Sequence, residues 1–125
     1  VILPLHPRTA TALSAEGIVF RRVRQIEPLG YLDMIALETN AGVIATDSGG
    51  VQKEAFFYRV PCVTLRDETE WVELVELGWN RLVSPGAEGM AASILAAHGS
   101  AGRDAAPYGD GSAALRIAAL LSGAA

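Results

Sequence analysis

Short apolar runs alternate along the chain with longer segments whose apolar positions recur every three or four residues. Runs of this length are typical of buried strands, and the longer spacing is typical of amphipathic helices. The pattern predicts strands at residues 1–5, 23–26, 43–46, 61–65 and 80–83. It predicts helices that end near residue 15 and that cover residues 31–40, 49–58, 87–97 and 113–121. This alternation favours an α/β fold, here a three-layer Rossmann-like parallel sheet of about five strands with helices on both faces.

The polar stretch DSGGVQKEA, residues 47–55, has the layout of an anion site, because it follows a strand and opens a helix. Gly49 and Gly50 let the backbone turn sharply and approach a ligand closely. The free N–H groups of the first helical turn and the helix dipole favour negative charge there. Ser48 adds a hydroxyl and could equally serve as the helix N-cap. Glu54 lies roughly 7 Å farther along the helix axis, where its carboxylate could accept from sugar hydroxyls.

Taken alone, these residues leave a second interpretation open. Ser-Gly-Gly is also a common strand-to-helix turn, and a helical glutamate is usually solvated. In the helix before it, Leu32, Ile35 and Ala36 share one face and are expected in the core, whereas Asp33 and Glu38 are expected to be solvated.

Several motifs carry a resemblance to a known family. The run TDSGGVQKEAFFYRVPCVTLRDETEWVELVELGWNRLV, residues 46–83, resembles the signature region of the non-hydrolysing UDP-N-acetylglucosamine 2-epimerases. HPRT at 6–9, EPLGYLDM at 27–34 and PYGDGSAALRI at 107–117 are similar as well, in the family's order. The resemblance implies most of the C-terminal half of a glycosyltransferase-B type fold, with UDP bound in the cleft between two halves and mainly on this one.

The resemblance also implies the chemistry, which is inversion at C2 of a UDP-sugar by elimination and re-addition of UDP, for cell-surface polysaccharide precursors. In the family the acid and base belong to the N-terminal half, so no catalytic residue is expected in this chain. Because the chain opens in a strand without a methionine, we expect residues 1–125 to be a single, partial C-terminal domain that lacks the catalytic domain and is inactive alone. A homodimeric parent enzyme without cofactor or metal is implied.

Individual site residues follow from the matching motifs. The resemblance implies a UDP site made by Ser48, Gly49, Gly50, Glu54, Leu29 and Met34, with the last two beside the uracil. The family commonly has an aromatic residue at the position of Met34 and a glutamate at that of Lys53. His6 matches a histidine that is associated in some members with a second, regulatory nucleotide-sugar. On position alone, His6 could instead fill a strand end while Thr9 caps the helix.

Arg66 and Glu70 are candidates for substrate contacts. Arg66 follows a strand and faces the expected anion site, although it could equally pair with Asp67 or Glu70 on the surface. Asp67 and Glu70 also have the spacing of a capping box. The common family pattern Thr-Glu-Arg-Pro-Glu reads Thr-Glu-Trp-Val-Glu here, from residue 69. This version resembles the branch that acts on UDP-2,3-diacetamido-2,3-dideoxyglucuronate, which is the specific alternative.

Composition narrows the remaining possibilities. The chain has 125 residues, half of them apolar, and a net charge of −4, which is typical of one globular domain. No basic cluster indicates nucleic acid, and no apolar run approaches the length of a membrane span. The single Cys62, in an apolar run, is expected to be a buried thiol in a cytoplasmic protein. Two further hypotheses remain: the donor-binding half of a glycosyltransferase, and a non-catalytic nucleotide-sugar-binding module.

Overall fold

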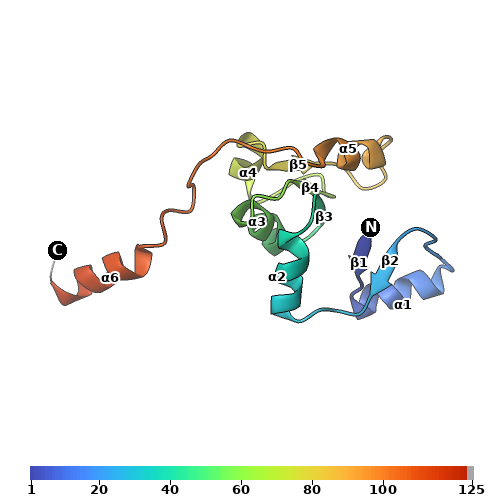
Figure 1. Ribbon diagram of the computed structural model, residues 1–125, viewed down its shortest axis with the longest axis horizontal. Coiled ribbons are helices and arrows are strands. Elements are labelled where there is room, and N and C mark those ends of the chain that lie inside the picture. Colours follow the sequence, from blue (N-terminus) through green and yellow to red (C-terminus); the bar gives the residue numbers. More distant parts are fainter. Residues whose placement is uncertain (124–125) are drawn as a thin grey trace. The chain divides into compact units, whose positions relative to one another are not determined.

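The computed structural model describes residues 1–123, in which the predicted strands and helices occur in the predicted order, with one further short helix at Val72–Glu76 (Figure 1). The strands are β1 (Ile2–Pro4), β2 (Arg24–Ile26), β3 (Ile44–Thr46), β4 (Cys62–Thr64) and β5 (Asn80–Leu82). The helices are α1 (Pro7–Ala15), α2 (Tyr31–Thr39), α3 (Gly49–Phe57), α4 (Val72–Glu76), α5 (Met90–Ala97) and α6 (Ala113–Ser122). The α/β class is therefore confirmed.

The strands pair in two sets, which belong to two compact units. The first unit, residues 1–37, contains β1 and β2, which are parallel with Ile2 opposite Arg24. The second unit begins at Glu38 and contains the parallel order β3-β4-β5. The expectation of one sheet of about five strands thus differs from the pairing in the described residues, because apolar periodicity locates strands but does not determine which of them hydrogen-bond.

The core of the second unit lies where α3, α4 and β5 meet. Leu74 is fully buried and packs with Phe56 and Trp79, whose rings are edge to face at 6.3 Å. β4 is buried throughout, as expected for a strand between two parallel neighbours. Cys62 is therefore the buried thiol that was predicted, and burial raises its pKa to about 11.

Three expectations for α2 are wrong. Leu32 and Ala36 were expected in the core, but Leu32 is 77% exposed and Ala36 is exposed as well. Glu38 was expected in solvent but is only 3% exposed. Apolar residues occur all round this helix, so the sequence pattern did not determine which side would be covered.

Within residues 1–123, no helix combines the length and the apolar character that a bilayer crossing would need.

Truncation of Leu74 tests the assignment of the core. Leu74→Ala removes a fully buried side chain, and we expect the free energy of unfolding to fall by about 2–5 kcal/mol in chemical denaturation. Val72, in the same helix, is 59% exposed, so Val72→Ala is the matched control and should change stability by less than about 0.5 kcal/mol. Equal effects of the two substitutions would contradict this core.

Candidate functional site

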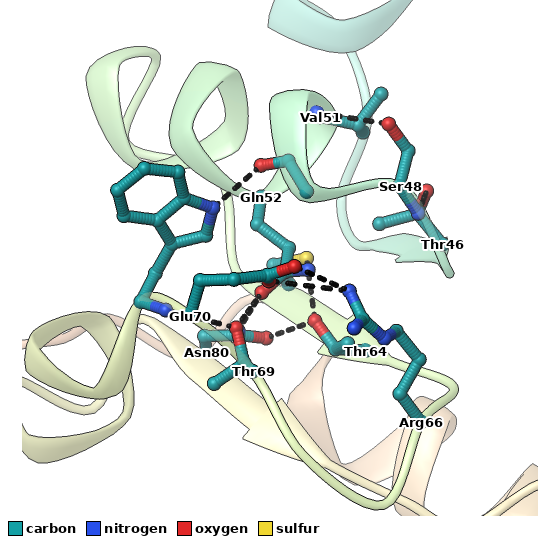
Figure 2. A network of polar contacts seen from close by, with 12 residues as sticks. Thr46, Ser48, Val51, Gln52, Thr64, Arg66, Thr69, Glu70 and Asn80 are labelled. Carbon is teal, nitrogen blue, oxygen red and sulfur yellow. Dashed lines mark hydrogen bonds and ion pairs between the residues drawn. The ribbon is translucent and has the colours of Figure 1, made fainter.

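The turn from β3 into α3 is held by two hydroxyl groups. Ser48 is the N-cap of α3, and its Oγ accepts a hydrogen bond from the N–H of Val51 at 3.5 Å. The backbone N–H of Ser48 itself donates to Oγ1 of Thr46, the last residue of β3, at 3.1 Å. The capping role of Ser48 is confirmed, and α3 therefore starts directly beyond the carboxyl end of β3 (Figure 2).

Gly49 and Gly50 are the first two residues of α3, and neither has the positive φ that only glycine adopts readily. A Cβ at Gly50 would lie 3.8 Å from Oγ of Ser48, its nearest neighbour, and a Cβ at Gly49 would lie 3.5 Å from Nε1 of Trp71. These are ordinary contact distances, so this chain's own packing does not require glycine at either position. The N–H groups of both residues precede the first intrahelical hydrogen bond and point out of the helix start.

Glu54 lies in the second turn of α3, half-buried, and it influences a neighbouring carboxyl. Neither carboxyl oxygen of Glu38 has a hydrogen-bond partner among the described residues. Burial raises the pKa of Glu38, and the carboxylate of Glu54 raises it further. Glu38 is thus an acid whose neutral form is favoured, next to the helix that carries the candidate site.

Arg66 and Glu70 form an ion pair beside the start of α3, with Nη1 of Arg66 3.2 Å from Oε2 of Glu70. The same oxygen of Glu70 lies 3.7 Å from the place that a Cβ on Gly49 would take. A hydrogen bond from the backbone of Glu70, followed by the Arg66 guanidinium, lowers the pKa of Glu70. The pairing that the sequence left open is therefore with Glu70, and the pair lies close to the candidate anion site.

The predicted capping box between Asp67 and Glu70 is wrong. The helix that follows begins at Val72, and its N-cap residue, Trp71, makes no side-chain cap hydrogen bond. Asp67 instead accepts from the hydroxyl of Ser84, which follows β5. The spacing of Asp67 and Glu70 gave a wrong prediction because residues 67–70 precede the helix and are not part of its first turn.

A buried hydrogen-bond network joins α3 to the loop between β4 and α4 and to β5, and sequence reasoning missed it (Figure 2). Oε1 of Gln52 accepts from Thr69 Oγ1 at 2.6 Å and from Asn80 Nδ2 at 3.0 Å. Oδ1 of Asn80 in turn accepts from Thr64 Oγ1 at 2.8 Å. One signal was available: Gln52 shares a helical stripe with Ala55 and Phe56, and a polar residue in a buried stripe needs hydrogen-bond partners.

The other three predicted site residues, His6, Leu29 and Met34, belong to the first unit. His6 is the N-cap of α1, and its Nδ1 accepts from the N–H of Arg8 at 3.2 Å, so the alternative in which Thr9 caps this helix is wrong. Leu29 and Met34 are half-buried on either side of Gly30. The roles of these residues in binding nucleotide stay predictions.

Two hollows can be placed along the strands of the described residues, one in each unit. The first, about 630 Å³, is lined by Leu5, Ile26 and Glu27 among others, at the carboxyl ends of β1 and β2. The second, about 420 Å³, is lined by Cys62 and Asn80, the first residues of β4 and β5. Arg81 and Leu82 line it as well, so it extends along β5, and none of the predicted site residues is in its lining. Among residues 1–123, no group of three or more His, Cys, Asp or Glu could hold a metal ion.

Comparison with known proteins decides the family. Residues 1–122 match the sequence profile of the family described as UDP-N-acetylglucosamine 2-epimerase. The chain belongs to this family. The UDP-2,3-diacetamido-2,3-dideoxy-D-glucuronate 2-epimerase of Pseudomonas aeruginosa is 48% identical over 123 residues, which are 98% of this chain and 34% of that protein. The UDP-N-acetylglucosamine 2-epimerase of Methanocaldococcus jannaschii is 39% identical over 127 residues, 98% of this chain and 35% of that protein.

Solved structures of the 2-epimerase family have the same fold as this chain. The Methanocaldococcus jannaschii UDP-GlcNAc 2-epimerase superposes with a TM-score of 0.84 at 38% identity, over 98% of this chain and 35% of that protein. Its complex with UDP-GlcNAc and UDP gives a TM-score of 0.82 over the same shares. The chain thus spans about a third of the length of these relatives. The glycosyltransferase-B type fold expected from the motifs is confirmed.

The raised pKa of Glu38 predicts how the stability of the protein depends on pH. A carboxyl whose pKa is higher in the folded than in the unfolded chain binds more protons when folded, so stability falls as pH rises from its unfolded towards its folded pKa. Glu38→Gln stays neutral throughout. We expect the free energy of unfolding of this variant, relative to wild type, to be larger at about pH 7 than at about pH 4.

Glu76→Gln, at an exposed position in α4, serves as the control in the same denaturation series. A difference between wild type and Glu38→Gln that is constant over this range would show that Glu38 is not held in a raised-pKa state.

Proposed function

We propose that this chain is the UDP-binding part of a longer UDP-sugar 2-epimerase, which inverts C2 by elimination and re-addition of UDP. One observation carries the proposal: two glycines that the fold itself does not require open a helix at the carboxyl end of β3. Such a start presents backbone N–H groups to an anion with nothing but hydrogen on the glycine Cα atoms. Membership of the 2-epimerase family supports UDP as the anion's source.

In this proposal, the diphosphate binds at the start of α3. The N–H groups of Gly49 and Gly50 and the hydroxyl of Ser48 donate to its oxygens, together with the positive end of the helix dipole. These donors stabilise the negative charge that UDP gains when the bond between C1 of the sugar and oxygen breaks. Glu54, roughly 7 Å along the axis, accepts from the ribose hydroxyls. Leu29 and Met34 are assigned to the uracil.

Arg66 reduces the electrostatic repulsion that an anion would meet at the start of α3. A carboxylate at Glu70 would by itself repel a phosphate near Gly49, because like charges at short range are unfavourable. The guanidinium of Arg66, paired with that carboxylate, offsets its charge. The planar guanidinium of Arg66 can also pair with a phosphate oxygen in place of a Glu70 oxygen, because it binds both kinds of group.

The sugar is one of two candidates. UDP-N-acetylglucosamine is the substrate named for most of the relatives. UDP-2,3-diacetamido-2,3-dideoxyglucuronate is favoured by the 48% identity to the Pseudomonas aeruginosa enzyme and by Trp71 in place of the family's arginine. Incubating the complete polypeptide with each sugar, and following the appearance of the C2 epimer by proton NMR, separates the two.

The proposal extends to the complete enzyme. Its acid and base belong to a domain outside residues 1–125, so these residues alone bind UDP without turnover. The free, buried thiol of Cys62 suits a reducing compartment. We assign the complete enzyme to the cytoplasm as a homodimer, and His6 to a contact with substrate or with a regulatory nucleotide-sugar.

Removal of one carboxylate tests the nucleotide site. In the complete polypeptide, Glu54→Ala should raise the dissociation constant of UDP in calorimetry by roughly tenfold or more, because a charge-assisted hydrogen bond contributes about 1.5–3 kcal/mol. Glu76→Ala, an exposed glutamate in α4, is the control. UDP binding that survives Glu54→Ala unchanged would favour a scaffold without a nucleotide site.

Substitution of Gly50 tests whether the phosphate lies close to the backbone at the start of α3. Gly50→Ala places a methyl group beside the Ser48 hydroxyl without a clash inside the chain. The free energy of unfolding should stay the same or rise by up to about 1 kcal/mol, because alanine favours a helix over glycine. The affinity for UDP should nevertheless fall by roughly tenfold, since the methyl group takes space next to the phosphate. Unchanged affinity in calorimetry would place the anion elsewhere.

A further inference from the structure

The ring of Trp71 is held by two residues from other parts of the chain. Nζ of Lys53, in α3, lies 4.2 Å from the centroid of the Trp71 ring and 4.2 Å from that of Tyr108. The two rings are edge to face, 6.3 Å apart at 87°. The hydroxyl of Tyr108 donates to Oε1 of Glu73 at 2.7 Å, which keeps its ring in place. An ammonium group between two aromatic rings is a favourable cation–π arrangement, and it restrains the indole.

The restrained indole contacts the first residue of α3. Nε1 of Trp71 donates to the carbonyl oxygen of Gly49 at 2.9 Å. The backbone N–H of Trp71 donates to Oγ1 of Thr69 at 3.1 Å, and that hydroxyl donates to Gln52. The loop before α4 is thus attached to α3 both at its first residue and at its fourth.

The contact with Gly49 controls more than one carbonyl group. The carbonyl of Gly49 and the N–H of Gly50 belong to the same planar peptide unit, so fixing the direction of one fixes the direction of the other. Two successive glycines have more backbone freedom than any other pair, and the first turn of a helix has few hydrogen bonds of its own. The indole supplies the restraint that the glycines lack.

We propose that Trp71 is a positioning residue that aims the N–H of Gly50 at the diphosphate through its hydrogen bond to the Gly49 carbonyl. The inference rests on the proposed function, because it takes the start of α3 as the diphosphate site. It assigns Lys53 and Tyr108 to holding the indole. Lys53 therefore acts on the ligand through Trp71, although a lysine near a phosphate site would usually be taken for a direct contact.

The experiment compares UDP with uridine in the complete polypeptide. Trp71→Phe keeps an aromatic ring for Lys53 but removes the indole donor. We expect the dissociation constant of UDP to rise about threefold to tenfold, as for the loss of one neutral hydrogen bond, while that of uridine stays within about twofold. Uridine reports on the nucleoside subsite alone, because it has no phosphate.

Trp79→Phe is the matched control. It removes the same type of bond, from the indole Nε1 to the carbonyl of Arg103 at 2.9 Å, but in the core and away from Gly49. Both dissociation constants should stay within about twofold of wild type in this variant. If Trp71→Phe leaves UDP binding unchanged, or weakens UDP and uridine alike, or if both tryptophan variants weaken UDP equally, the positioning role is wrong.

The outcomes also separate this inference from the function on which it rests. If the wild-type protein does not bind UDP, or if Glu54→Ala binds it normally, the proposed nucleotide site itself is wrong. If Glu54→Ala weakens UDP binding but Trp71→Phe does not, only the role of Trp71 is wrong.

Discussion

The second unit depends on a buried amide oxygen that accepts two hydrogen bonds. Oε1 of Gln52, whose side chain is fully buried, accepts from Thr69 and from Asn80. A buried acceptor without a partner costs more than its hydrogen bond contributes, so these elements must keep the positions that satisfy it. The amide thereby couples the helix that opens at Gly49, the loop that contains Thr69 and strand β5.

This coupling explains how one unit can present a precise anion site from short elements. The strands of the sheet have three residues each, and α4 has five. Elements of this length gain little from their own hydrogen bonds, and their positions come mainly from contacts with neighbours. Gln52 supplies a polar contact of this kind, to Thr69, and Leu74 supplies an apolar one, to Phe56 and Trp79.

Three carboxyl groups lie on or near α3, and each is accommodated differently. Glu38 is buried, which favours its neutral form. Glu70 pairs with Arg66, so its charge is offset locally. Glu54 stays half-buried and lies farther along the helix, where hydroxyl donors rather than phosphates are assigned to it. The positions of these carboxyl groups and their pairing therefore matter more for an anion at α3 than the chain's net charge of −4.

Family membership and geometry contribute different parts of the interpretation. The identity to relatives extends over nearly the whole chain but over only about a third of each relative. It supports UDP as the ligand, whereas the unneeded glycines, the Ser48 cap and the neighbouring Arg66–Glu70 pair indicate where the diphosphate would bind. The departures from the family pattern at Lys53 and Trp71 contact each other, so they form one feature of this chain.

The sequence by itself determined the order of the five strands and of the longer helices and the burial of Cys62, and it identified Ser48 as a candidate cap, because each depends on residues close together in the chain. It did not determine that Glu38 would be buried, that the strands would pair in two sets, or that Gln52 would join Thr69 and Asn80. Those features were decided only in the tertiary structure. They depend on contacts between residues that are far apart in the sequence, such as the two partners of Gln52, which are 17 and 28 residues away from it. Local periodicity contains no information about contacts of this kind.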